Sequence, residues 1–188
     1  MEAADIAILG IAGILLAALS AAIVVERRRR RKLLGILHSE TSGLCREAAE
    51  LAEAICSRQA DGRIVDQAVL DRYALSEPRT YPGLVSSLWR LPGDLAWRAV
   101  EFHGHLSLAR ARLAAWRPGE SGPVSTYLLV SALLRSANGA EGLLRNSALR
   151  PGRPEDWKPH MPLANAFIER IEHTDPELMD HGYWSLPG

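Results

Sequence analysis

An uninterrupted apolar run near the start of the chain limits the choice of fold more than any other feature. Between Ile6 and Val25 no residue is charged, and Ser20 is the one polar side chain. At about 1.5 Å per residue, a helix of about 20 residues covers roughly 30 Å, the thickness of the hydrocarbon core of a bilayer. The run therefore predicts a transmembrane helix over residues 6–25.

A block of basic residues follows the apolar run and predicts its orientation. After Glu26 the sequence continues with Arg27, Arg28, Arg29, Arg30, Arg31 and Lys32, whereas residues 1–5 contain Glu2 and Asp5 and no base. Because Lys and Arg flanks stay on the cytoplasmic side of a membrane, residues 1–5 are expected outside and residues 26–32 form a stop-transfer signal. The basic side chains are expected to contact anionic lipid headgroups, where each gains about 1 kcal/mol.

Two other interpretations of the apolar run stay open. Residues 18–22 (Ala-Leu-Ser-Ala-Ala) resemble the cleavage site of a signal peptide, although such a peptide carries its bases before the apolar core. The run is also compatible with a helix buried in a water-soluble core, but the arginines directly behind it are unfavourable there.

Charge and cysteine content exclude several classes of protein. The net charge of zero divides into +3 for residues 1–32 and −3 for the remainder, which therefore lacks the basic face that nucleic-acid binding requires. The two cysteines, Cys45 and Cys56, do not have metal-binding spacing, and about 16 Å of helix would separate them, too far for a disulfide. We interpret them as buried thiols. The preference for Arg over Lys, together with abundant Ala, is typical of bacterial proteins from GC-rich genomes.

Heptad-like patterns predict that the rest of the chain is an all-α bundle. One apolar seam consists of Leu37, Thr41, Leu44, Ala48, Leu51 and Ile55, and a second of Leu95, Ala99, Phe102, Leu106, Ala109, Leu113 and Trp116. Spacings of three and four are typical of coiled coils and bundles. Two seams of matched length predict an antiparallel cytoplasmic bundle over residues 33–172, into which the membrane helix continues, followed by an irregular tail at 173–188.

Smaller features complete this expected fold. Glu40, Glu47, Glu50 and Glu53 lie off the first seam and are expected to face solvent. A short helix within residues 63–73 is expected to bury Ile64 and Ala68, with Val65 and Val69 as further candidates, and a last helix over residues 163–172 is expected to bury Leu163, Phe167 and Ile171. No stretch shows the alternation of a strand.

No pattern identifies a catalytic, cofactor or metal site. In a helix His103 and His105 point about 200° apart, so they cannot share an ion, and Glu101 with His105 is expected to be a surface contact. The tail contains His173, Asp175, Glu177, Asp180 and His181, which would ligate a metal only if the segment folded back on itself. We therefore expect a protein that is not an enzyme and has no cofactor, and keep a metal-dependent enzyme as an alternative.

Small residues recur along one face of the apolar run. Gly13, Ala17 and Ala21 have the four-residue spacing that lets two membrane helices approach closely. This spacing predicts self-association, and the Leu37–Ile55 seam is a second candidate surface for it.

Three short segments carry a resemblance to known proteins. Residues 81–84 (Tyr-Pro-Gly-Leu), 91–96 (Leu-Pro-Gly-Asp-Leu-Ala) and 100–102 (Val-Glu-Phe) resemble a pattern in small uncharacterised bacterial proteins that look like single-span inner-membrane proteins with a helical cytoplasmic region. The resemblance covers residues 6–115. It implies the architecture of a single membrane span followed by a helical cytoplasmic region, and it provides no catalytic residues. The expected function is that of a membrane-anchored, non-enzymatic interaction or scaffold protein at the inner face of the bacterial cell membrane. A single-span sensor or regulator that transmits a change through the helix behind the membrane is the alternative.

Overall fold

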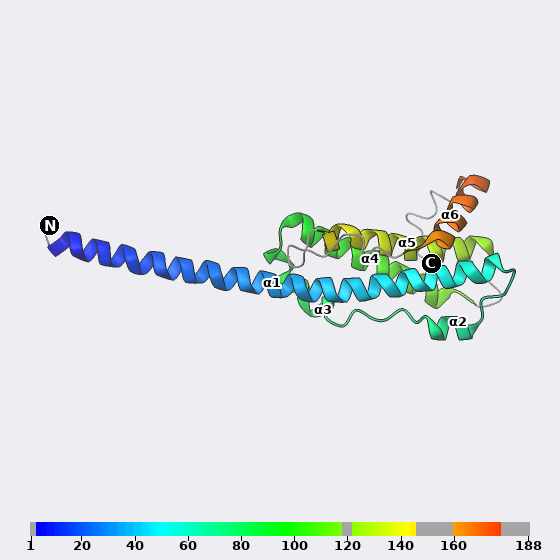
Figure 1. The fold of residues 1–188 in the computed structure, drawn as a ribbon, viewed down its shortest axis with the longest axis horizontal. Coiled ribbons are helices and arrows are strands. Elements are labelled where there is room, and N and C mark those ends of the chain that lie inside the picture. Colours follow the sequence, from blue (N-terminus) through cyan, green and yellow to red (C-terminus); the bar gives the residue numbers. More distant parts are fainter. Residues whose placement is uncertain (1–2, 118–121, 146–159, 178–188) are drawn as a thin grey trace.

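A computed structural model describes residues 3–117, 122–145 and 160–177, with side chains described from Gly13 onward. Every regular element in these ranges is a helix, which confirms the all-α fold class. One long helix leaves a compact bundle at one end and carries the N-terminus far from it (Figure 1).

Helix α1 (Ala3–Ala60) joins the predicted membrane segment to the first seam without a break. Its 58 residues span about 87 Å. It ends at the Asp61-Gly62 pair, where Gly62 has a φ of 66° and its N–H donates to the carbonyl of Gln59 at 3.0 Å. The N–H of Arg63 donates to the carbonyl of Arg58 at 2.8 Å, which completes a Schellman motif.

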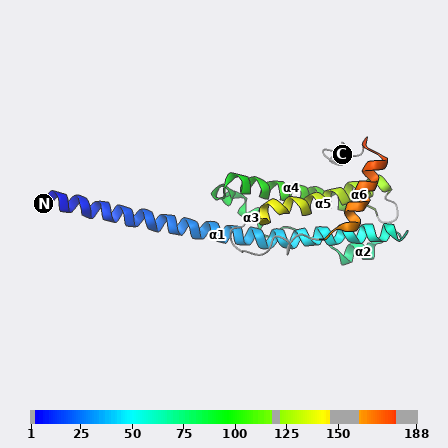
Figure 2. The same ribbon diagram turned by 45° about the horizontal axis from the view of Figure 1, so that its top comes forward.

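Helix α5 (Pro123–Arg145) is the centre of the bundle and packs against both α1 and α4 (Gly93–Ala115). Helices α1 and α4 run in the same direction, and α5 runs opposite to both (Figures 1 and 2). The Sγ of Cys45 donates to the carbonyl of Ala137 at 3.5 Å, and Arg112 donates to the carbonyl of Leu128 at 2.6 Å. The antiparallel partner of each predicted seam is therefore α5, and the two seam helices are parallel to each other.

Both predicted seams are buried. In the first, Leu37, Thr41, Leu44, Ala48, Leu51 and Ile55 are all buried; in the second, Leu113 alone is half-buried and the other members are buried. Because the first seam is covered within the chain, it is not available to a second copy, and the expected self-association through it is wrong.

The connection from α1 to α4 contains three short helices: α2 (Gln67–Arg72), α3 (Tyr81–Leu84) and the 3₁₀ helix η1 (Val85–Arg90). The Asp66 carboxylate caps α2 by accepting from the Val69 N–H at 3.0 Å. The helix therefore starts only after residue 66, and Val65 and Val69 are buried while Ile64 is 69% exposed. The expectation that Ile64 and Ala68 form the buried face is wrong for this reason.

Three glutamates expected to face solvent instead hold other segments on α1. Glu40 accepts hydrogen bonds from three consecutive backbone N–H groups, those of Arg79, Thr80 and Tyr81, at 2.7, 2.7 and 2.9 Å. Glu47 accepts from the N–H and the hydroxyl of Ser76 at 2.8 and 3.0 Å. Glu53 accepts from the Leu163 N–H at 3.2 Å. These carboxylates fix the chain between α2 and α3, and the start of α6, along α1.

Helix α6 (Pro162–Thr174) closes the end of the bundle away from the N-terminus and packs against α1 and α5 (Figures 1 and 2). Phe167 is buried as predicted. Leu163 is 43% exposed, and its neighbour Ala164 is buried instead. The hydroxyl of Tyr127, a fully buried α5 residue, donates to Glu172 at 2.9 Å.

Candidate membrane-surface site

Within the predicted span, side chains are described for residues 13–25. There α1 is a single helix that no other element covers. Its large apolar side chains are exposed on all sides: Ile14, Leu15, Leu16, Leu19, Ile23, Val24 and Val25 are 45% to 71% exposed. Among the residues whose side chains are described, no helix offers a stretch long and apolar enough to cross a membrane. Residues 6–12, the first part of the predicted span, lie outside that set.

The small-residue stripe lies on this uncovered segment. Gly13, Ala17 and Ala21 are exposed, and a Cβ atom added to Gly13 would meet nothing within 4 Å in the chain. No element of the described bundle occupies the face on which a second helix would lie.

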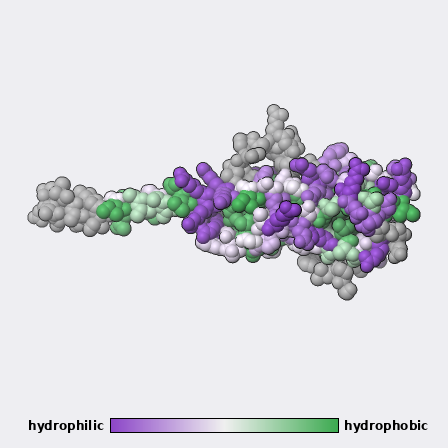
Figure 3. Space-filling model, turned by 90° about the horizontal axis from the view of Figure 1, so that it is seen from below, coloured by the Kyte–Doolittle hydropathy of each residue, from purple (hydrophilic) through white to green (hydrophobic). Residues whose placement is uncertain are grey.

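The basic collar, residues 27–32, directly follows the uncovered segment. All six side chains are exposed. In Figure 3 a hydrophilic band crosses α1 on the face shown, between the apolar helix on one side and the bundle on the other. The structure therefore places the predicted lipid-contacting residues at the junction of the uncovered segment and the bundle.

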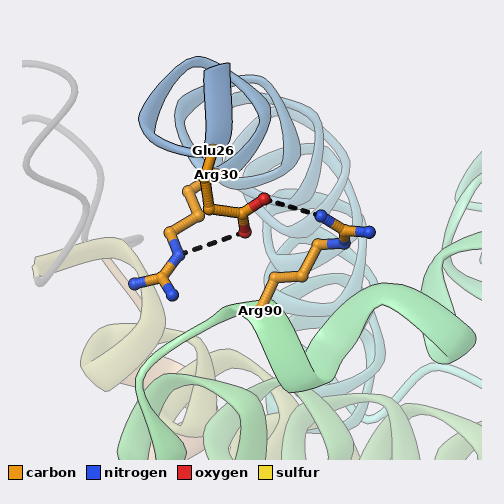
Figure 4. Close-up of polar contacts among 3 residues, drawn as sticks. All are labelled: Glu26, Arg30 and Arg90. Atoms are coloured by element: carbon orange, nitrogen blue, oxygen red, sulfur yellow. Dashed lines mark hydrogen bonds and ion pairs between the residues drawn. The ribbon is translucent and has the colours of Figure 1, made fainter. Parts of the chain in front are cut away.

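Glu26, directly after the apolar segment, connects that segment to the bundle. Its carboxylate accepts from Arg30 at 3.4 Å and from Arg90 of η1 at 2.8 Å (Figure 4). The guanidinium of Arg90 lies 4.6 Å from the centroid of the Trp89 ring. The burial of Leu33 beside Leu88 and Leu91 supports this contact. Sequence analysis missed the arrangement because it joins residues that are far apart in the chain.

A second feature missed by sequence analysis is a groove between α3, η1 and α4. His103 is 4% exposed, and its ring stacks on Tyr81 with centroids 3.5 Å apart and meets the edge of Phe102 at 4.9 Å. The groove encloses about 780 Å³, and its walls include Pro78, Pro82, Val85, Val100, Ser107 and the ion-paired Arg110 and Glu77. His103 is covered because Tyr81, at the start of α3, stacks on its ring. Of the two residues of the expected surface contact, Glu101 is exposed and His105 is half-buried.

Burial sets the ionisation of this region. Desolvation lowers the pKa of His103 to about 4, against the opposing effect of the Glu40 charge, so the ring is neutral at pH 7. Neither ring nitrogen has a hydrogen-bond partner among the described residues. Burial acts to raise the pKa of Glu40, but the N–H groups of Thr80, Arg79 and Tyr81 outweigh it and hold that pKa below its ordinary value.

The other candidate residues do not come together. In the described ranges no group of three His, Cys, Asp or Glu side chains could hold a metal ion. His173, Asp175 and Glu177 are exposed, and Asp180 and His181 lie outside the described residues. Cys45 and Cys56 are free and buried, as predicted, and burial raises their thiol pKa values to about 11 and about 12.

Comparison with known proteins assigns no family to this arrangement. No protein-family model, no curated protein and no solved structure matches the chain.

Proposed function

We propose that this protein is a single-pass membrane protein that holds a helical bundle against the cytoplasmic face of a bacterial cell membrane, where the bundle serves as a non-enzymatic interaction or scaffold surface. The observation that carries the proposal is the uncovered apolar half of α1, which ends in an exposed basic collar and continues as the first helix of the bundle.

The physical argument is the cost of leaving this segment in water. Burying a large aliphatic side chain gains about 1.5–3 kcal/mol, and seven such side chains between Ile14 and Val25 contact no part of the bundle that would bury them. With residues 6–12, which are equally apolar in sequence, the helix matches the thickness of a bilayer. The resemblance of residues 6–115 to single-span inner-membrane proteins supports the same architecture.

Partner capture from native membranes tests the scaffold function. Full-length protein that carries a photo-crosslinker at exposed bundle positions such as Glu101 is expected to capture one recurring protein partner, and to stay with the membrane pellet after carbonate washing. A carbonate-soluble protein would contradict the anchor. Stable anchoring without any recurring crosslink would contradict the scaffold function while leaving the anchor in place.

Neutralising the basic collar is expected to disturb the orientation of the anchor. Changing residues 27–32 to Gln removes the six positive charges directly behind the span and leaves Glu2, Asp5 and Glu26 as the charged residues of 1–32. Since Lys and Arg near the end of a span determine orientation, the C-terminal domain should appear on both sides of the membrane. Protease protection of a C-terminal tag in spheroplasts measures this. The matched control changes Arg27 to Arg31 into Lys, and unchanged protection is expected there because the charge is kept.

The small-residue stripe is expected to support a homodimer. Leucine at Gly13 and Ala17 would hold two anchors apart, so crosslinked dimer in mild detergent should fall at least fivefold. The control is Ile14→Ala, an equally exposed position beside the stripe. A monomeric wild-type protein, or dimer yields that do not respond to either leucine, would contradict self-association through this face.

A sensor function is the second candidate, favoured by the unbroken course of α1 and by the Glu26–Arg90 contact between anchor and bundle. A rigid helix of this kind would transmit a rotation of the membrane segment to the bundle. A protein that is only tethered to the membrane does not need such a helix. Inserting one residue beside Gly35 turns the anchor by about 100° relative to the bundle. Crosslinked partners that change with this insertion would favour the sensor, and indifference would favour the scaffold.

A further inference from the structure

The position of Trp89 identifies a second membrane contact, one that the polypeptide forms only when folded. Trp89 lies on η1, and its side chain is among the most exposed of the large hydrophobic residues, at 71%. It is 64 residues away from the end of the predicted span in sequence, so no pattern at the span itself indicates it.

A chain of contacts fixes the level of Trp89 along α1. The Trp89 ring is 4.6 Å from the Arg90 guanidinium, and that guanidinium donates to the Glu26 carboxylate at 2.8 Å. Glu26 is the first residue after the apolar run. Figure 4 shows Arg90 reaching from η1 to this carboxylate, and Figure 1 shows the chain between α3 and α4 at the end of the bundle from which α1 emerges. Trp89 is therefore level with the point where the anchor would leave the hydrocarbon core.

Composition and charge indicate what would cover this side chain. Membrane spans are usually flanked by Trp and Tyr at the headgroup level, yet residues 1–32 contain neither. At the same level the basic collar surrounds α1 with six exposed cations, and the half-buried Arg90, which is paired with Glu26, lies beside Trp89. An aromatic ring next to exposed cations matches the headgroup region of an anionic bilayer, in which the ring lies below the phosphates that the cations contact.

We propose that η1, through Trp89 together with the basic collar, docks on the headgroup region of an anionic phospholipid bilayer and supplies the interfacial aromatic residue that the anchor lacks. This inference rests on the proposed membrane anchoring. It adds that the bundle lies against the bilayer at one defined edge, because contacts at both α1 and η1 fix its tilt, whereas a helix alone would leave it free to swing.

Brominated phospholipids test the contact with the full-length chain. The protein is reconstituted into vesicles of phosphatidylcholine and phosphatidylglycerol, with or without lipids brominated near the headgroup end of their acyl chains. Trp89→Phe is compared with the wild type, and the difference between their emission spectra is the emission of Trp89. We expect brominated lipids to quench this difference at least twofold.

The matched control is Trp116→Phe. Trp116 follows α4, whose 23 residues cover about 35 Å from the η1 end of the bundle, and it is 6% exposed. Its difference emission should be insensitive to brominated lipids.

The outcomes separate this inference from the proposed anchoring. Vesicles that float with the protein but leave the Trp89 emission unquenched would overturn the η1 contact and leave the anchor standing. Protein that does not float with vesicles would overturn both. Quenching that is equally strong in vesicles of phosphatidylcholine alone would show a contact that does not depend on anionic lipid, and would overturn the role assigned to the basic collar.

Discussion

Replacing Phe102 by alanine is expected to lower the free energy of unfolding by about 4 kcal/mol, the largest effect of any single substitution considered for this fold. Phe102 is fully buried in the core between α1, α4 and α5, and its ring meets the edge of the His103 ring at 4.9 Å. Truncation removes the apolar contacts and leaves a cavity in the core cluster to which α1, α4 and α5 all contribute. Urea unfolding of the full-length protein in detergent, followed by circular dichroism, measures the change.

Val100→Ala is the matched control for this prediction. It removes apolar carbon from the same helix, but Val100 is 45% exposed, so a change within about 0.5 kcal/mol is expected. A loss at Phe102 as small as the loss at Val100 would mean that α4 is not packed on α5 as described, and would remove the basis of the bundle.

The two seams show what sequence periodicity can predict. Positions such as Leu51 and Leu106 repeat at spacings of three and four because α1 and α4 each bury one stripe, and the pattern reports the buried face directly. The end of α1 was equally predictable, because Gly62 adopts a left-handed conformation that favours glycine.

The central place of α5 was not predictable in the same way. Small residues such as Ser131, Ser136 and Ala137 allow α1 and α4 to approach it from two sides, and a helix buried on most sides has no polar face to set against an apolar one. Its buried residues therefore do not form a single stripe like those of the two seams. The two seams were expected to lie antiparallel to each other, whereas α5 is the antiparallel partner of both.

The groove and the η1 contact escaped prediction because they depend on how the 61–92 connection folds back. Glu40 looked like a solvated heptad position, yet its carboxylate binds three backbone N–H groups and so holds Tyr81 against His103. The Glu26–Arg90 pair depends on the same connection, since η1 follows α3 directly. Contacts between elements that are distant in sequence leave no local periodicity from which to infer them.

Mild acid is expected to destabilise the bundle through His103, and the His103→Phe variant is expected to lose that sensitivity. The folded-state pKa of His103 is lowered to about 4 from an ordinary value of 6.5, chiefly by burial, so the unfolded chain binds a proton at His103 more readily than the folded chain. The contribution is fully favourable above pH 6.5 and is lost as the pH falls from about 6.5 to about 4. A shift of this size corresponds to about 3 kcal/mol in total, or about 1.4 kcal/mol per pH unit within the window.

The groups that surround the His103 ring allow the loss of stability between about pH 6.5 and about pH 4 to be assigned to His103 itself. Glu40 faces it from α1, Tyr81 stacks on it from α3, and Glu77 and Arg110 line the same groove. Glu40 contributes at lower pH, because its pKa is held below 4.5 and its stabilising hydrogen bonds are lost only as the pH falls through that lower value. Tyr81→Phe is the matched control, since it keeps the stacked ring and titrates nothing in this range.

Free energies of unfolding at pH 7, 6, 5 and 4 decide whether His103 is part of the bundle core or accessible to water. The wild type and Tyr81→Phe should lose stability steeply across the window, and His103→Phe should follow a curve flatter by about 3 kcal/mol at its acid end. At pH 7 the phenylalanine variant should be at least as stable as the wild type, because two ring nitrogens without hydrogen-bond partners are replaced by carbon. Parallel curves for all three proteins would mean that water reaches the ring through the groove, and His103 would then be an accessible group on the bundle surface instead of part of its core.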